Sequence, residues 1–192
     1  MVSVNSTMVP LGTAAPPFEL PDPNGVTWTL DKVAGPKGTL VAFLCNHCPY
    51  VRHIAAPLGA AAARWRQQGV GAIGINSNDP RAHPDEAPER MAENATSRRW
   101  TFPYVSDPEQ RAAHAYRAAC TPDFYLFDGA RRLVYRGRFD AARPGNGVPV
   151  TGDELDAAVA SVIAGEEIEI GQLASIGCNI KWTPGNEPAW FG

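Results

Sequence analysis

The sequence has little net charge and no long apolar run. Its formal net charge is −3 over 192 residues, so nothing drives a general attraction to nucleic acid or to an anionic membrane surface. No apolar run reaches the roughly 18–20 residues that a membrane-spanning helix needs. The first residues lack a basic start and a long apolar segment, so we expect no signal peptide and a cytoplasmic protein. We therefore expect its partners to be neither nucleic acid nor membranes.

Cysteine is also scarce: the sequence contains four, Cys45, Cys48, Cys120 and Cys178. A cytoplasmic protein of this size does not depend on a framework of structural disulfides. A C-x-x-C pair in such a protein is more often catalytic or metal-binding. The length and the 44% hydrophobic content are enough for one core, so we expect a single domain over residues 1–192.

Strand and helix patterns alternate along the chain. Residues 16–30 are typical of two short strands with a turn at Pro23-Asn24-Gly25. Apolar runs at 38–44 and 69–76 indicate strands buried on both faces. Helices are predicted over 51–65, 83–100, 108–120 and 151–165, the last with a capping box from Thr151 to Glu154. A strand within 103–107 and a hairpin of 124–127 with 133–139 complete the set.

This order predicts an α/β fold, with a central mixed sheet flanked by helices. Strands that alternate with helices form parallel sheets covered on both faces, and the late hairpin adds antiparallel strands. The first hairpin is an N-terminal extension, and we expect residues 1–15 to be flexible. Residues 168–192 carry Trp182, Trp190 and Phe191 among prolines and glycines, which predicts an irregular tail packed on the domain.

The Cys45–Cys48 pair stands between a buried strand and a helix, where sites form in open α/β sheets. A helix N-terminus offers unpaired N–H groups and a partial positive charge, which stabilise a thiolate. Such a setting lowers a cysteine pKa from about 8.5 to about 3.5–7.5. We expect Cys45, at the cap, to be the more exposed and attacking thiol, and Cys48 to resolve. His47 can donate to the Cys45 thiolate, which makes the disulfide more oxidising.

Two other interpretations of the pair stay open. The cysteines could simply pack in the core, where cysteine is common. Alternatively, Cys45, Cys48, Cys178 and either His47 or His53 could form a Cys/His zinc site. No second C-x-x-C or H-x-x-x-H motif accompanies them, and adjacent residues chelate poorly together. We therefore predict no metal and no bound cofactor.

The segment Cys120-Thr121-Pro122 precedes a predicted strand. It forms either an ordinary turn or a cis X–Pro bond that brings backbone against the redox pair; about 5% of X–Pro bonds are cis. Cys120 lies near the pair in the second case and is a buried thiol at a helix end in the first. Asp123 either caps the hairpin or touches substrate.

Three further residues have simpler expectations. His83 and His114 sit beside or within helical segments, so we interpret both as surface residues. Cys178 follows a glycine and precedes a polar residue, which favours a buried thiol that holds the tail.

Motifs spread over most of the chain resemble one known group. They are FLCNHCPYV, INSND, CTPDFYLFD, YRGRFD and GCNIKW, and the resemblance runs from about Pro16 to Pro188. The chain resembles the thioredoxin-like superfamily in its redoxin branch (AhpC/TSA-like or peroxiredoxin-like), in a subgroup with a CNHCPYV signature. The resemblance implies a thioredoxin-like fold, Cys45 as nucleophile, Cys48 as resolving thiol and Thr121-Pro122 as the cis-proline loop.

Two departures from the resembling families matter. Thioredoxins carry a buried acid on the strand before the motif, where this chain has Ala42. Typical peroxiredoxins carry Pro-x-x-x-Thr/Ser-x-x-Cys. With Cys48 as the peroxidatic residue, Cys45 takes the threonine position and Val41 the proline position. The residues that hold a peroxide are therefore missing.

The preferred function is thiol–disulfide exchange with a protein or low-molecular-weight thiol or disulfide, without a bound cofactor. One alternative is a thiol peroxidase, an antioxidant that reduces hydroperoxides through a sulfenic acid on Cys45 or Cys48. Cys120 or Cys178 would then be an extra resolving thiol. A second alternative is a redox-sensing or metal-binding module. The sequence leaves the oligomeric state open.

Overall fold

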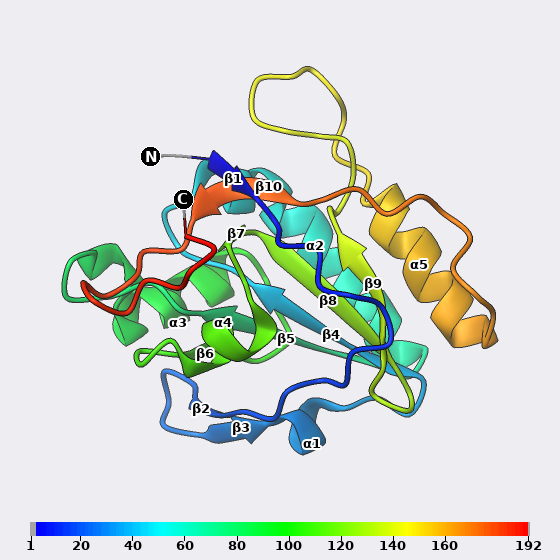
Figure 1. The fold of residues 1–192 in the computed structure, drawn as a ribbon, viewed down its shortest axis with the longest axis horizontal. Coiled ribbons are helices and arrows are strands. Elements are labelled where there is room, and N and C mark those ends of the chain that lie inside the picture. The colour runs from blue at the N-terminus through cyan, green and yellow to red at the C-terminus, as the bar shows by residue number, and fades with distance from the viewer. Residues whose placement is uncertain (1–2, 192) are drawn as a thin grey trace.

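The computed structural model describes residues 3–191, and its centre is a five-stranded mixed sheet of order β6-β5-β4-β8-β9 (Figure 1). Strands β4 (Gly38–Phe43), β5 (Val70–Asn76) and β6 (Tyr104–Ser106) run parallel. Strands β8 (Asp123–Asp128) and β9 (Leu133–Gly137) add the antiparallel side. The mixed α/β architecture predicted from the sequence is confirmed.

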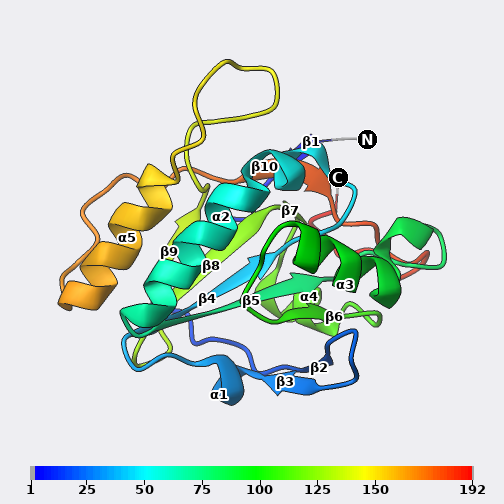
Figure 2. The ribbon, with the colours of Figure 1, turned by 180° about the vertical axis from the view of Figure 1, so that it is seen from behind.

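Strand β4 lies at the middle of this sheet, and all six of its residues are buried. Because side chains alternate along a strand, Leu40 and Ala42 face one core and Val41 and Phe43 face the other. The first core lies under helices α2 (Pro49–Gln67) and α5 (Asp153–Ala164), which Figure 2 shows from behind. The second lies under the N-terminal hairpin, α1 (Leu30–Val33) and α4 (Arg111–Tyr116).

Helix α2 buries the side chains predicted for its apolar face: Val51, Ile54, Ala55, Leu58, Ala62 and Trp65. Pro49 lies in its first turn, where a missing N–H costs no hydrogen bond. The N-terminal extension is also confirmed, since β2 (Glu19–Pro21) pairs antiparallel with β3 (Thr27–Thr29). The described residues contain no helix that is long and apolar enough to cross a membrane.

The C-terminal tail is not wholly irregular, because Ile176–Asn179 form strand β10. It is the middle strand of a small antiparallel sheet, between β1 (Ser3–Asn5) and β7 (Cys120–Thr121). The pattern that would have indicated β10 is only four residues long and holds a glycine. Ser3–Asn5, in the segment predicted to be flexible, form β1. Trp182 and Trp190 pack on the domain as predicted, whereas Phe191 is exposed.

Two predicted helices are shorter than expected. Residues 83–100 divide into a 3₁₀ turn, η1 (Pro84–Glu86), and helix α3 (Pro88–Ser97). Ala87 between them is extended, because a residue before proline avoids the helical region. Helix α4 ends at Tyr116, followed by Arg117 in a left-handed conformation. Cys120 therefore lies in a strand and not at a helix end.

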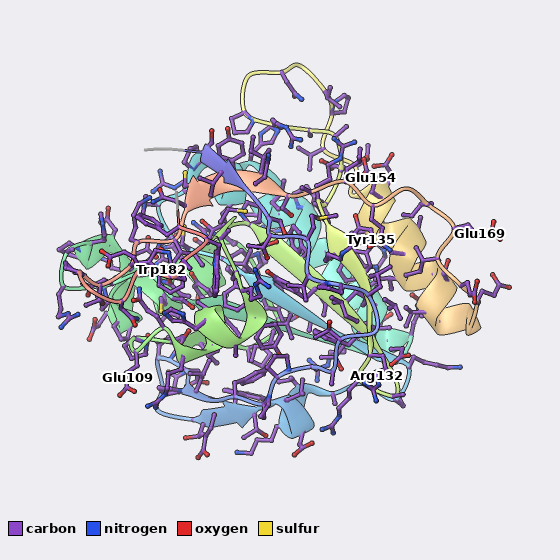
Figure 3. All side chains as sticks on the ribbon, in the orientation of Figure 1. Glu109, Arg132, Tyr135, Glu154, Glu169 and Trp182 are labelled. Carbon is purple, nitrogen blue, oxygen red and sulfur yellow. The ribbon has the colours of Figure 1, made fainter. Side chains whose placement is uncertain are left out.

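The predicted capping box of α5 does not form. Gly152, with φ 71°, is the N-cap residue. The buried carboxylate of Asp140 accepts the N–H groups of Thr151 and Gly152 at 2.8 and 2.7 Å. Glu154 instead binds Arg138 at 2.9 Å; Figure 3 shows Glu154 at the start of α5. Gly165, with φ 74°, ends the helix as predicted.

Candidate active site

Cys45 and Cys48 lie at the carboxyl end of β4 and the start of α2, against the Thr121-Pro122 loop. The Sγ of Cys45 lies 3.1 Å from the Oγ1 of Thr121, and the Sγ of Cys48 lies 3.2 Å from the Thr121 carbonyl oxygen, to which it donates when it is protonated. The Thr121–Pro122 peptide bond is cis, as predicted. One residue of this loop therefore contacts both thiols, one through its side chain and one through its backbone.

The positions of the two thiols differ from the prediction in one respect. Cys48, not Cys45, is the N-cap residue of α2, and both cysteines are fully buried. The expectation that Cys45 is the more exposed sulfur at the cap is therefore wrong. The first N–H groups of a helix have no partner within the helix, so proline, which lacks an N–H group, is tolerated at the first position. Pro49 takes that position in α2, which makes Cys48 the N-cap residue.

The electrostatics of the pair favour a thiolate on Cys48. Hydrogen bonding from the Cys45 thiol, with help from Cys178 and the backbone N–H of Val51, lowers the pKa of Cys48 to about 5 against the effect of burial. Burial, hydrogen bonding with Cys48 and the negative charge of Glu86 raise the pKa of Cys45. Both shifts therefore favour the proton on Cys45 and the negative charge on Cys48.

The other two cysteines also lie near this centre. Cys178 on β10 is opposite Thr121 in the strand register, and it belongs to the same buried cluster as Cys45 and Cys48. Burial and hydrogen bonding with Cys48 raise the pKa of Cys178 to about 12. Cys120 is buried, and its Sγ lies 3.5 Å from the Pro122 carbonyl. Burial, then the charges of Asp123 and Cys48, raise its pKa.

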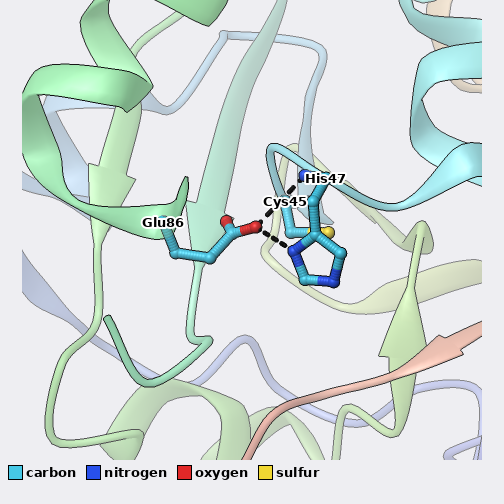
Figure 4. A group of neighbouring side chains, drawn as sticks. All are labelled: Cys45, His47 and Glu86. Carbon is cyan, nitrogen blue, oxygen red and sulfur yellow. Dashed lines mark hydrogen bonds and ion pairs between the residues drawn. The ribbon is translucent and has the colours of Figure 1, made fainter. Parts of the chain in front are cut away.

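A buried acid that the sequence analysis did not identify, Glu86, completes the site. Its side chain is 0% exposed, and its Oε1 binds both the Nδ1 and the backbone N–H of His47, as Figure 4 shows. Its Oε2 accepts from the Asn46 backbone at 2.9 Å and from the Asn76 side chain at 2.7 Å. Burial raises the pKa of Glu86, but the bonds from His47 and Asn46 outweigh it and lower the pKa below its usual range.

The sequence contains one signal that could have indicated this role. Glu86 lies two residues before Pro88, and the residue before a proline avoids the helical region, which argues against one unbroken helix over 83–100. The break at Ala87 turns the 3₁₀ segment inward against the strand ends. Nothing local distinguishes Glu86 from its exposed neighbour Asp85, however, because its partners come from other elements.

Two arginines hold the backbone between the cysteines. Arg98 donates to the carbonyls of Cys45 at 3.2 Å and of Asn46 at 2.6 Å, and Arg52 donates to Asn46 at 3.2 Å. Tyr104 donates to the Asn46 side chain at 3.1 Å. The segment that carries the thiols is therefore anchored from α2, β6 and the end of α3.

The remaining candidate residues are dispersed. The half-buried His83 stacks on His47 with ring centroids 5.8 Å apart, so it is not a plain surface residue. The Nε2 of the half-buried His114 donates to the Asn186 carbonyl at 2.9 Å, far along the chain from the cysteines. Asp123 is buried beside Tyr125, on the core opposite the cysteines. The hairpin turn is instead capped by Asp128, which accepts from Ala130 and Arg132.

A possible metal-binding group differs from the zinc site considered above. One potential ligand atom from each of Cys45, His47 and Glu86 lies within 4.8 Å of the others. His53 is not part of that group, and its Nε2 is buried without a hydrogen-bond partner. The three residues offer a thiolate, an imidazole and a carboxylate, a mixture that suits zinc.

Comparison with known proteins identifies the family. A family model described as the AhpC/TSA family matches residues 11–136. The chain belongs to the AhpC/TSA family. No curated protein matches the sequence at a significant level.

Solved structures similar to this AhpC/TSA protein show its fold. A hypothetical protein from Sinorhizobium meliloti is 48% identical, with a TM-score of 0.92 over 94% of this chain and 99% of its own. An uncharacterized conserved protein from Geobacillus kaustophilus is 44% identical, with a TM-score of 0.94 over 96% and 98%. The thioredoxin domain of an oxidoreductase from Bacteroides vulgatus is 18% identical, with a TM-score of 0.57 over 67% and 88%. The fold is therefore thioredoxin-like.

Proposed function

We propose that this AhpC/TSA protein is a thiol–disulfide oxidoreductase whose redox centre is the Cys45–Cys48 pair. The observation that carries the proposal is the contact of both sulfurs with Thr121, at 3.1 and 3.2 Å, where α2 begins. A dithiol at a helix N-terminus is suited to exchange because one sulfur is stabilised as a thiolate while the other waits nearby as a thiol.

The electrostatics support Cys48 as the attacking group. Its thiolate attacks one sulfur of a substrate disulfide, and the other substrate sulfur leaves as a thiolate that takes up a proton. Cys45 then loses its proton and attacks the Sγ of Cys48, which releases the second substrate sulfur and forms the Cys45–Cys48 disulfide. The substrate disulfide is reduced to two thiols, and the pair is oxidised. This order of attack is the reverse of the one that the resemblance implies.

His47 and Glu86 supply a route for the proton of Cys45. The His47 ring is held by the Glu86 carboxylate, and one atom of each lies within 4.8 Å of the Cys45 sulfur. An imidazole held by a carboxylate can take a proton and keep its orientation. In this proposal His47 and Glu86 together replace the buried strand acid of thioredoxins, whose position is occupied here by Ala42.

The partner is a protein or a small molecule with a disulfide or thiols, in the cytoplasm, and no bound cofactor is needed. Next to Pro122 the surface has a shallow cavity of about 20 Å³, lined by residues that include Tyr50, Arg143 and Ile176. This volume holds about one water molecule, so a substrate would lie across the surface there rather than enter a deep pocket.

The test follows thiol loss and turnover in wild type, Cys45→Ser and Cys48→Ser. Reduced protein is mixed with a model protein disulfide, and with hydrogen peroxide or an organic hydroperoxide in parallel. The proposal expects rapid thiol loss with the disulfide and catalysis of insulin reduction by a dithiol, both abolished by Cys48→Ser. If Cys45→Ser, and not Cys48→Ser, no longer forms a mixed disulfide with the substrate, Cys45 is the nucleophile. No reaction with any disulfide would overturn the proposal.

A thiol peroxidase is the second candidate, favoured by the family and by the low pKa of the buried Cys48 thiol. This chain, however, lacks the threonine and proline of the peroxiredoxin motif, and Cys45 occupies the threonine position. Faster thiol loss with peroxide than with disulfide, with a sulfenic acid trapped by dimedone on Cys48, would select it. Stoichiometric zinc in the purified protein, lost in Glu86→Gln, would instead select a metal-binding role for the cluster of Cys45, His47 and Glu86.

A further inference from the structure

Cys178 lies on the same face of its sheet as the side chain that holds Cys45. Strand β10 pairs with β7, and Cys178 is directly opposite Thr121. Side chains of residues opposite each other in an antiparallel pair lie on one face, with Cβ atoms about 4.5–5.5 Å apart. The Thr121 side chain on that face contacts Cys45, and the Thr121 carbonyl oxygen lies 3.2 Å from the Sγ of Cys48. The register therefore brings three thiols to one residue.

The strand that carries Cys178 is held firmly. It is paired on both sides, with Ser3 opposite Cys178 on β1 and Thr121 opposite it on β7. Gly177 packs so closely on β7 that a Cβ there would lie 2.0 Å from the Thr121 carbonyl oxygen. Cys178 therefore stands at a set position beside the pair, as a rigid element and not as part of a loose tail.

The charges around the two thiols that could attack Cys48 differ. Glu86 lies beside Cys45, and its negative charge opposes loss of the Cys45 proton. Lys181 lies three residues after Cys178, and its positive charge lowers the pKa of Cys178. Burial and the neighbouring Cys48 raise the same pKa. Once Cys48 is bound to a substrate sulfur, it no longer carries the negative charge that opposes ionisation of either neighbour.

We propose that Cys178 is a second resolving thiol, which competes with Cys45 for the mixed disulfide on Cys48. The sulfur of Cys178 attacks the Sγ of Cys48, and the bond between Cys48 and the substrate sulfur breaks. The substrate leaves as a thiolate and takes up the proton that Cys178 loses, and a Cys48–Cys178 disulfide forms. This step rests on the proposed function, since it begins from the mixed disulfide. Its product ties β10 to the start of α2.

The test uses Cys45→Ser, which leaves Cys178 as the candidate resolving thiol. The reduced variant is treated with oxidised glutathione, and disulfides are mapped by mass spectrometry of peptides without reduction. The inference expects a Cys48–Cys178 disulfide and two released glutathione molecules per chain. In Cys45→Ser/Cys178→Ser a stable glutathione adduct on Cys48 should accumulate instead, at least tenfold above the level in Cys45→Ser.

Cys45→Ser/Cys120→Ser is the matched control, because Cys120 is a buried thiol two positions from Pro122 on the neighbouring strand. It should still form the Cys48–Cys178 disulfide. A lasting glutathione adduct in Cys45→Ser, or a Cys48–Cys120 disulfide, would overturn the inference. If Cys45→Ser does not fold by circular dichroism, Cys45→Ala carries the same test.

The outcomes separate this inference from the proposed function. A wild-type protein that forms the Cys45–Cys48 disulfide while Cys45→Ser stops at the adduct retains the oxidoreductase and loses only the role of Cys178. A wild-type protein that does not react with oxidised glutathione or with the model protein disulfide loses both.

Discussion

The carboxylate of Glu86 is hydrogen-bonded to the Nδ1 of His47, one residue before Cys48 and two after Cys45. The same carboxylate accepts the backbone N–H groups of Asn46 and His47, so one buried acid holds both residues between the cysteines. Glu86, from η1, therefore reaches the cysteine pair from outside β4, the strand that leads into it.

Glu86→Gln is expected to change the resolution step and its pH dependence. The negative charge of Glu86 raises the pKa of Cys45, so its removal should shift the pH–rate profile of resolution to lower pH. Loss of a charged hydrogen bond, worth about 1.5–3 kcal/mol, should also free the His47 ring and lower the plateau rate about tenfold or more. Single-turnover kinetics of mixed-disulfide resolution between pH 5 and 9 measure both effects.

Glu89→Gln is the matched control, since Glu89 is an exposed acid on α3. It should leave the profile unchanged. A purely structural role for Glu86 would predict lower stability without any shift of the profile, and that result would contradict the positioning role.

We expect ionisation of Cys48 in the folded protein to make the stability of the fold depend on pH. An unfolded cysteine has a pKa of about 8.5, while the folded pKa of Cys48 is about 5. Between these values the unfolded chain binds the extra proton, so the free energy of unfolding rises with pH across this window. The contribution, a few kcal/mol, is lost as pH falls through about 5. Denaturant titration of wild type and Cys48→Ser should show a difference that grows from pH 5 to 8.5.

Cys120→Ser is the control for this linkage, because Cys120 is a buried thiol whose pKa is raised. It should leave the slope of stability against pH between 5 and 8 as in wild type. An equal slope in wild type and Cys48→Ser would show that Cys48 is not ionised in the folded protein. Thiolate absorbance near 240 nm gives an independent reading of the same titration.

Asp123 should impose the opposite pH dependence. Burial raises its pKa to about 7, against hydrogen bonds that include the one from Tyr125 at 3.0 Å. The folded state then binds the extra proton between about pH 4, the usual pKa of aspartate, and 7, so stability falls as pH rises through this range. Asp123→Asn should remove that fall in denaturant titrations. The same change at the exposed Glu167, Glu167→Gln, should not; an unchanged fall in Asp123→Asn would refute the assignment.

Gly177→Ala should disturb the three-thiol cluster through the backbone. A Cβ at Gly177 would lie 2.0 Å from the Thr121 carbonyl oxygen, so β10 and β7 must separate. Such overpacking typically costs about 1–3 kcal/mol in unfolding free energy. Thermal denaturation should show the loss, and Gly171→Ala, whose Cβ meets nothing within 4 Å, should stay within about 0.5 kcal/mol of wild type. Equal stabilities of the two variants would contradict the close packing of β10.

The sequence by itself determined the elements whose signals are local. The apolar run of β4 and the buried face of α2 follow from periodicities of two and 3.6 residues, which act within one segment. The C-x-x-C between them marked the cysteine pair that we propose as the redox centre. The prediction of a cis bond before Pro122 came from the resemblance to redoxins, since the residues alone favoured an ordinary turn and only about 5% of X–Pro bonds are cis.

Only the tertiary structure decided how the site is assembled around the pair. Glu86 meets His47 39 residues away along the chain, and Cys48 meets the Thr121 carbonyl 73 residues away. Cys178 reaches the same loop because β10, four residues long, inserts between β1 and β7. Such contacts leave no local pattern in the sequence, because the residues around each partner reflect only the secondary structure of their own segment. The pairing of strands, and the break of the helix before Pro88, bring Glu86 and Cys178 to the Cys45–Cys48 pair.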